Sequence, residues 1–189
     1  MDIYISDKSK KDEYIKFVKF WEEKWYPEII KKLEASALSV GSCLLYTSNH
    51  NKFRIADGLQ EHAYLHATML RDADKTDIFR VNLMEKAENV YLCKEEQLLQ
   101  ETVSEEVLQD FLNSHLILSA KRKTHLDILL SHMAFVFDYH DAYALSIVLK
   151  QQYIERMAMR YQFQRPQAQQ AVQLAMHHAV KYMQDRIGA

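Results

Sequence analysis

His62 and His66 stand four residues apart in the stretch EHAYLHATML, which has a helical pattern. Residues four apart lie on the same side of an α-helix, so both imidazoles would share one direction. A zinc or iron site uses such a pair but takes at least one further protein ligand. The spacing therefore raises a metal site as one hypothesis for this segment.

The segment 125–141 supplies the candidates for a third ligand, and the predicted metal site combines His132 with His62 and His66. Neither HExxH nor the paired ExxH motif of di-iron helical bundles occurs in the chain. The alternative is that both histidines are core residues, hydrogen bonded to a backbone carbonyl or a carboxylate. We favour this alternative because the sequence defines no third ligand. Other possible donors on the segment are His125, Asp138, His140 and Asp141.

The sequence DYHDAY at 138–143 gathers acids, a base and phenols in six positions. Asp138 or Asp141 could orient His140 for acid–base chemistry, but no serine or cysteine in a nucleophile turn accompanies them. The favoured interpretation is that Asp141 caps a helix and His140 ends the preceding one. The three glycines of the chain cannot build a phosphate-binding loop. We therefore predict no catalytic residues.

The composition predicts helices joined by short turns, because glycine occurs three times and proline twice in 189 residues. We expect one all-α domain over residues 1–189, a bundle of about seven or eight helices. Breaks are expected at DADKT (72–76), at KRKT (121–124) and before Pro166. The expected helices run from about residue 10, from 27, over 57–71, 76–98, 104–118, 124–140 and 141–161, and from 166 onward.

Local signals position several of these helices. Thr124 and Asp127 have the spacing of a capping box, and Ser104 can cap the helix before it. The segment 125–140 is the most apolar and is expected to be central. The last helix carries a stripe expected to be buried: Ala168, Ala171, Val172, Ala175, Ala179, Met183 and Ile187.

The N-terminal stretch 14–26 has aromatic side chains on more than one helical face. One stripe can enter the core, while a second face needs another partner, as at a protein interface. The alternative is a helix buried on two sides within its own domain. The residues predicted for an interface are Phe20, Trp21, Trp25 and Tyr26.

Arg156, Arg160 and Arg165 form a basic segment that could contact phosphates or an acidic protein surface. No second basic cluster and no helix-turn-helix pattern supports nucleic acid binding. Acidic residues dominate 81–111 and basic residues dominate 142–189. The simplest interpretation of this asymmetry is two solvated faces that attract each other in the fold.

The sequence predicts a cytoplasmic protein, since Cys43 and Cys93 lack CxxC spacing and no apolar run reaches the length of a membrane span. We expect a non-catalytic helical protein that acts through protein–protein interaction, as a regulator, adaptor, inhibitor or immunity-type partner, or as a homodimer. The alternative is a metal-dependent enzyme or sensor that uses His62, His66 and a ligand from 125–141. A third hypothesis is a haem or apolar-ligand pocket lined by these histidines with Met69 or Met133. No cofactor is predicted; only the alternative needs a transition metal.

Overall fold

The computed structural model of the chain describes residue 55 and residues 61–188. The chain divides into two compact units, Met1–Ser48 and Asn49–Ala189, and all the described residues belong to the second unit. These residues form eight α-helices and two short 3₁₀ helices, with no strand among them, so the all-α prediction is confirmed. A single domain over residues 1–189 stays a prediction.

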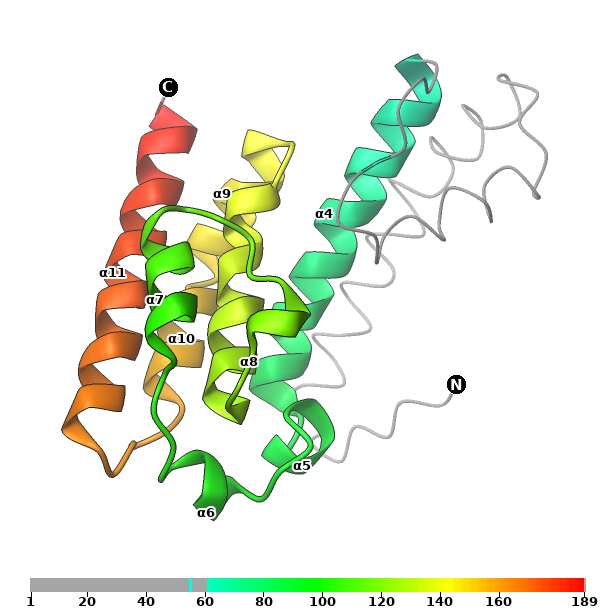
Figure 1. Cartoon of the computed structure of the whole chain (residues 1–189). Coiled ribbons are helices and arrows are strands. Elements are labelled where there is room, and N and C mark those ends of the chain that lie inside the picture. Colours follow the sequence, from blue (N-terminus) through cyan, green and yellow to red (C-terminus); the bar gives the residue numbers. More distant parts are fainter. Residues whose placement is uncertain (1–54, 56–60, 189) are drawn as a thin grey trace. The chain divides into compact units, whose positions relative to one another are not determined.

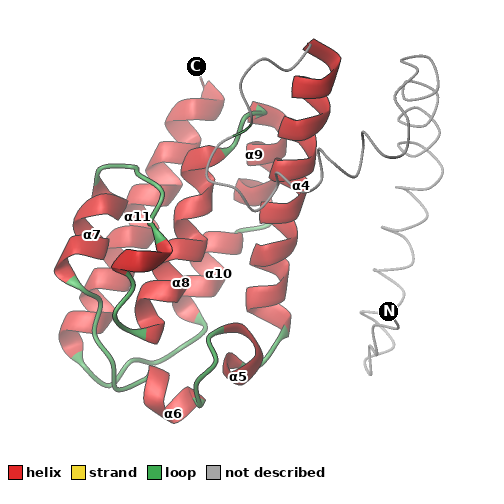
Figure 2. Cartoon of the chain, turned by 45° about the vertical axis from the view of Figure 1, so that its right-hand side comes forward, coloured by secondary structure: helices red, strands yellow, loops and turns green. Residues whose placement is uncertain are grey.

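Figures 1 and 2 show the longer helices side by side, with α5 and α6 at one end. The longest, α4 and α11, share the neighbours α8, α9 and α10, and α11 also packs on α7. The elements are α4 (Glu61–Met84), α5 (Ala87–Val90), α6 (Glu95–Leu98), α7 (Glu105–Leu112), η2 (Ser119–Lys121), α8 (His125–Met133), η3 (Ala134–Asp138), α9 (Ala142–Lys150), α10 (Tyr153–Met159) and α11 (Pro166–Gly188).

Helix α11 buries five of the seven residues of its predicted stripe, while Ala171 and Ile187 are half-buried. Ala168, Val172, Ala175, Ala179 and Met183 are fully buried, and the small alanines let neighbouring helices approach closely. Helix α8 contributes further core residues, and its central place is also confirmed. Each fully buried leucine there contributes roughly 1.5–3 kcal/mol to the free energy of folding. The apolar α8 residues with no exposed surface are Leu126, Leu129, Leu130 and Met133.

The predicted break at DADKT is wrong, because α4 continues through these residues. The stretch contains no glycine or proline, and its polar side chains do not all face water. Arg71, Asp72 and Lys75 are buried and have partners in residues 138–141. A polar stretch of helix whose side chains have buried partners can therefore be mistaken for a loop when only the sequence is considered.

The predicted helix over 76–98 is also wrong, since α4 ends at Met84 and two single-turn helices follow. Lys86 is extended, with ψ 156°, and Leu92 adopts a left-handed conformation with φ 61°. Neither conformation continues an α-helix. The apolar period of the sequence runs through both interruptions and so does not reveal them.

Two further expected helices are shorter than predicted for the same reason. The segment 104–118 is helical only to Leu112, where Ser114 at φ 58° closes the last turn through Ser114 N–H to Phe111 O and His115 N–H to Asp110 O. This pair of bonds is a Schellman motif, here without its usual glycine. The segment 141–161 is divided into α9 and α10 by Gln152 at φ 53°.

Candidate functional site

The structure separates His132 from the turn that carries His62 and His66. Positions 62 and 66 fall in the first turns of α4, and their side chains lie outside the described residues. His132 meets α4 near its other end, where its Nδ1 lies 3.1 Å from Oδ1 of Asn82. The rise of 1.5 Å per residue puts about 24 Å of helix axis between positions 66 and 82. The fold therefore does not bring His132 to positions 62 and 66.

The other predicted donors each have a local partner. His125 Nδ1 lies 2.7 Å from a Glu101 oxygen, and Asp141 accepts the N–H groups of Tyr143 and Ala144 as the predicted cap of α9. Among residues 61–188 as far as they are described, no three His, Cys, Asp or Glu side chains are grouped to hold a metal ion. Metal binding at His62 and His66 stays a prediction.

An ionic cluster, buried on its α4 side, joins α4 to the segment before α9. We call it the Asp72 cluster: Arg71, Asp72, Lys75, Asp138 and His140. Asp138 Oδ2 lies 2.5 Å from Arg71 Nη2 and 2.8 Å from Lys75 Nζ. Asp72 accepts the backbone N–H groups of His140 and Asp141, at 3.2 and 2.9 Å. The cluster therefore fixes the start of α9 against α4.

Burial and pairing oppose each other in this cluster. Burial lowers the pKa of Lys75, although its hydrogen bond to Asp138 opposes that shift. Burial would raise the pKa of Asp138, but the hydrogen bonds and charges of Lys75 and Arg71 outweigh it and lower that pKa. A buried ion pair with these partners is costly to break from either side.

The acid facing His140 is Asp72, rather than the Asp138 or Asp141 suggested by the sequence. His140 Nδ1 lies 3.5 Å from Asp72 Oδ1, and the edge of Tyr64 packs on the His140 ring. Within the described residues no serine or cysteine is hydrogen bonded to His140. The arrangement lacks a nucleophile and serves to hold two helices together.

A second polar cluster lies at the other end of α4. We call it the Asn82 cluster: Asn82, Tyr91, His132, Arg160 and Tyr161. Asn82 Oδ1 accepts from Tyr91 Oη at 2.7 Å and faces His132 Nδ1, so this nitrogen carries the imidazole hydrogen. The Arg160 guanidinium donates to the carbonyls of Asn82 and Glu85 and lies 5.1 Å from the Tyr161 ring centroid. The cluster ties α4, α8, α10 and the turn after α5 together.

Arg160 is the charged member of the Asn82 cluster at neutral pH. Burial lowers the pKa of His132 to about 4, and the charge of Arg122 acts in the same direction. Burial raises the pKa of Tyr91 and of Tyr161, so both phenols stay protonated. The Arg160 charge sits where a helix C-terminus stabilises a cation.

Three large apolar side chains that are close to this cluster in the chain are exposed. Met84 is 43% exposed, Leu92 83% and Met159 68%. Leu92 follows Tyr91 and Met159 precedes Arg160, and both of these neighbours belong to the cluster. Met84 precedes Glu85, whose carbonyl accepts a hydrogen bond from Arg160. Both views show α5 at this end of α4 (Figures 1 and 2). We call Met84, Leu92 and Met159 the Leu92 surface.

Sequence reasoning missed the Leu92 surface, because it placed Leu92 inside a long helix. Left-handed backbone is usually marked by glycine or asparagine, and here a leucine occupies it. The sequence signal for a break here is Lys94, Glu95 and Glu96 directly after the apolar residues 90–93. The same pattern also suits an uninterrupted helix.

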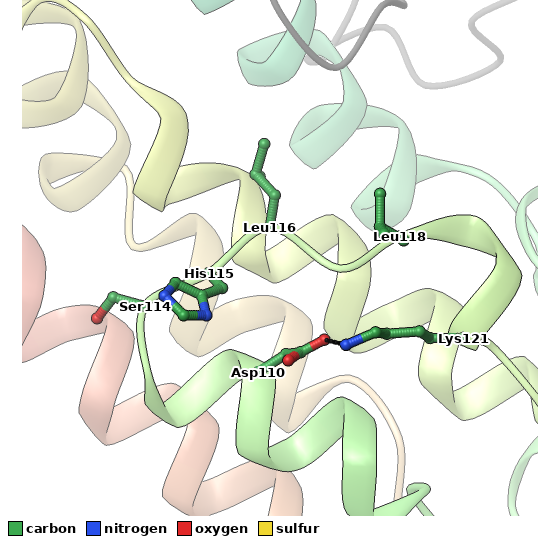
Figure 3. A pocket seen from close by; sticks show the side chains of 6 residues that line it. All are labelled: Asp110, Ser114, His115, Leu116, Leu118 and Lys121. Atoms are coloured by element: carbon green, nitrogen blue, oxygen red, sulfur yellow. Dashed lines mark hydrogen bonds and ion pairs between the residues drawn. The ribbon is translucent and has the colours of Figure 1, made fainter.

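An open pocket of about 340 Å³ lies between α7 and η2. Figure 3 shows the six side chains that line it. Lys121 Nζ lies 2.6 Å from Asp110 Oδ2 and 3.3 Å from Glu106 Oε1. The hydrogen bond to Asp110, and then the one to Glu106, raise the pKa of Lys121. The Ser114 side chain points away, and its Oγ lies 2.9 Å from His178 Nε2. Three polar side chains of this pocket, those of Asp110, Ser114 and Lys121, already have partners within the protein. Its lining is Asp110, Ser114, His115, Leu116, Leu118 and Lys121.

The predicted interface residues are distributed as follows. Arg156 and Arg165 are exposed, whereas Arg160 belongs to the Asn82 cluster. Within the described part of the chain no ion pair joins the acidic segment 81–111 to the basic segment 142–189, and the mutual attraction of these two segments stays a prediction. The predicted aromatic residues Phe20, Trp21, Trp25 and Tyr26 lie outside the described residues.

No family model, no curated protein and no solved structure matches this chain. Of the helices in the described part, none combines the length and the apolar composition that crossing a membrane requires.

Proposed function

We propose that this protein is a non-catalytic cytoplasmic helical protein that acts by binding another protein, and that the Leu92 surface is the contact. The observation that carries the proposal is Leu92 itself, which is 83% exposed in a left-handed conformation. A left-handed backbone costs an L-residue roughly 1–2 kcal/mol. Local strain of this kind gathers at functional positions.

The Asn82 cluster next to the Leu92 surface favours binding. An interface gains affinity when its anchor residues are held in place before the partner arrives. The Asn82 cluster does this here, because its hydrogen bonds fix the residues next to Leu92, Met84 and Met159. A few well-packed residues near the centre of an interface supply most of its binding energy.

The polar clusters support the same proposal by their composition. Asp72, Asp138 and His132 are each engaged by groups of the protein, and the pocket residues Lys121 and Asp110 pair with one another. These contacts support a structural role for the five titratable side chains. Within the described residues, the exposed apolar Leu92 surface is the feature that supports a binding function.

The test compares partner capture by tagged full-length protein and two variants. In one variant Leu92→Ser is combined with Met159→Gln; in the matched control Leu174→Ser alters a leucine that is 49% exposed on α11. We expect one protein from the source cells to co-purify with the parent and the control and to be lost with the double variant, while all three keep the same thermal midpoint. A partner retained equally by the double variant would remove the Leu92 surface as the contact.

A further inference from the structure

We propose that Met84 and Met159 form an oxidation site, where a hydroperoxide converts both thioethers to sulfoxides while the protein stays folded. Of the methionines in the described residues, these two alone are exposed, at 43% and 68%. Met133, Met157 and Met183 have at most 1% of their surface exposed. An oxidant therefore reaches two side chains directly, whereas the other three react only after a local opening of the fold.

Both exposed methionines lie at one junction, where the ends of α4 and α10 meet. Met84 is the last residue of α4 and Met159 the last of α10. Arg160, directly after Met159, donates at 2.5 Å to the carbonyl of Glu85, directly after Met84. The bonds of Arg160 to backbone carbonyls hold this junction and involve neither sulfur atom. Oxidation of the two side chains therefore leaves these bonds in place.

The reaction is a two-electron oxidation of sulfur by the hydroperoxide. The thioether sulfur attacks one peroxide oxygen, and the S–O bond forms as the O–O bond breaks. The other oxygen leaves and takes up a proton, which gives water when the oxidant is hydrogen peroxide. Sulfoxide reductases return methionine sulfoxide to the thioether, so the change from an apolar to a polar side chain is reversible.

Cys93, the cysteine of the described part, is a poor competitor for the oxidant. It is 6% exposed, and burial, followed by the charges of Glu101 and Glu88, raises the pKa of its thiol. The thiolate is the reactive form of cysteine, so a buried thiol that stays protonated reacts slowly. Among the described residues, the accessible sulfur chemistry is that of the two methionines.

Timed treatment of the folded full-length protein with hydrogen peroxide, followed by peptide mass spectrometry, tests the site. We expect Met84 and Met159 to oxidise at least about tenfold faster than Met133, Met157 and Met183. In protein unfolded by urea the five should oxidise at similar rates, which separates the effect of the fold from that of neighbouring residues. Equal rates in the folded protein, or faster oxidation of a buried methionine, would overturn the inference.

A second measurement asks whether the oxidised protein stays folded. Protein oxidised at Met84 and Met159 should keep its thermal midpoint within about 2 °C of the untreated protein, because both side chains face water. A sulfoxide reductase with dithiothreitol should then restore both residues in the folded protein. A larger fall in the midpoint would overturn the inference, since these side chains would then support the fold.

The consequence for binding rests on the proposed function. Sulfoxides make two members of the Leu92 surface polar, so oxidation should weaken partner capture by about tenfold. Met84→Leu combined with Met159→Leu keeps the apolar character without the sulfur and should resist this effect of peroxide. The matched control Met176→Leu, at a half-buried position of α11, should lose capture on oxidation as the parent does.

Equal capture before and after oxidation of the parent would show that the modification does not regulate binding. The proposed function is judged apart from this, with untreated protein, by whether Leu92→Ser combined with Met159→Gln loses its cellular partner.

Discussion

His132 on α8 donates a hydrogen bond from Nδ1 to Oδ1 of Asn82 at the end of α4, across 3.1 Å. The imidazole ring packs between the rings of Tyr91 and Phe135, with centroids 6.3 and 5.7 Å away. A neutral imidazole suits this place, whereas a charged one loses its hydration without gaining a carboxylate partner in the Asn82 cluster.

The first prediction follows from that difference. Burial lowers the pKa of His132 to about 4 in the folded protein, against 6.5 for the free side chain. The unfolded chain therefore binds this proton at a higher pH than the folded protein does, and stability is lost as pH falls from 6.5 to about 4. The loss from this residue should reach about 3 kcal/mol.

Urea unfolding measured at several pH values between 7 and 4 tests this prediction. His132→Gln has an amide donor but no titrating group, so its stability should change less over that interval than the parent's. His177→Gln, at an exposed position on α11, is the matched control. Parallel pH curves for parent and His132→Gln would show that His132 is not the group responsible.

The second prediction concerns the strain at Leu92. Leu92→Gly should raise the free energy of unfolding by about 1 kcal/mol, because glycine adopts a left-handed backbone without steric cost. Leu174→Gly places the same change inside α11 and should instead destabilise by about 1 kcal/mol. Chemical denaturation of both variants gives the comparison. A destabilised Leu92→Gly would mean that the leucine side chain supports the fold.

The third prediction concerns the Asp72 cluster. Asp138→Ala removes the carboxylate that Arg71 and Lys75 share, and should cost about 3–5 kcal/mol of stability. Asp77→Ala removes the partner of Arg80 in an exposed pair and should cost no more than about 1 kcal/mol. Thermal unfolding of the two variants measures the difference. Equal losses would contradict a structural role for the buried cluster.

The fourth prediction concerns the start of α8. Asp127 has no exposed surface and accepts the N–H groups of Ser104, Lys123 and Thr124, together with the Ser104 hydroxyl. Asp127→Asn should cost about 3 kcal/mol, because hydrogen bonds to a buried charge are each stronger than neutral ones. Thr124→Ala should cost about 1 kcal/mol, as an ordinary cap does. Similar losses in urea unfolding would show Asp127 acting only as a capping residue.

The sequence predicted the parts of the fold that depend on local signals. The capping box of Thr124 and Asp127, the cap at Asp141 and the apolar stripe of α11 are all confirmed. Each depends on residues within one or two turns of each other. Ser104 does occupy the N-cap of α7, but its hydroxyl is bonded to Asp127 instead of its own helix.

The sequence could not predict features that depend on distant partners. The polar stretch at Asp72 is helical because residues 138–141 supply its partners, more than sixty positions along the chain. The end of α4 depends on Arg160, and the Leu92 surface depends on a leucine in a conformation it seldom adopts. Periodicity contains no information about any of these contacts.

The contacts at the start of α8 also close a loop in the chain. Glu101 accepts the N–H groups of His125 and Leu126, and Ser104 is bonded to Asp127, so residues 101–104 are fastened to 125–127. The stretch between them contains an exposed tip at Leu118, Ser119 and Ala120. Doubling the length of a loop that is already closed adds only about 0.6 kcal/mol of entropic cost. The tip is therefore a place where a peptide tag or fluorescent label can be inserted while α7 and α8 keep their positions.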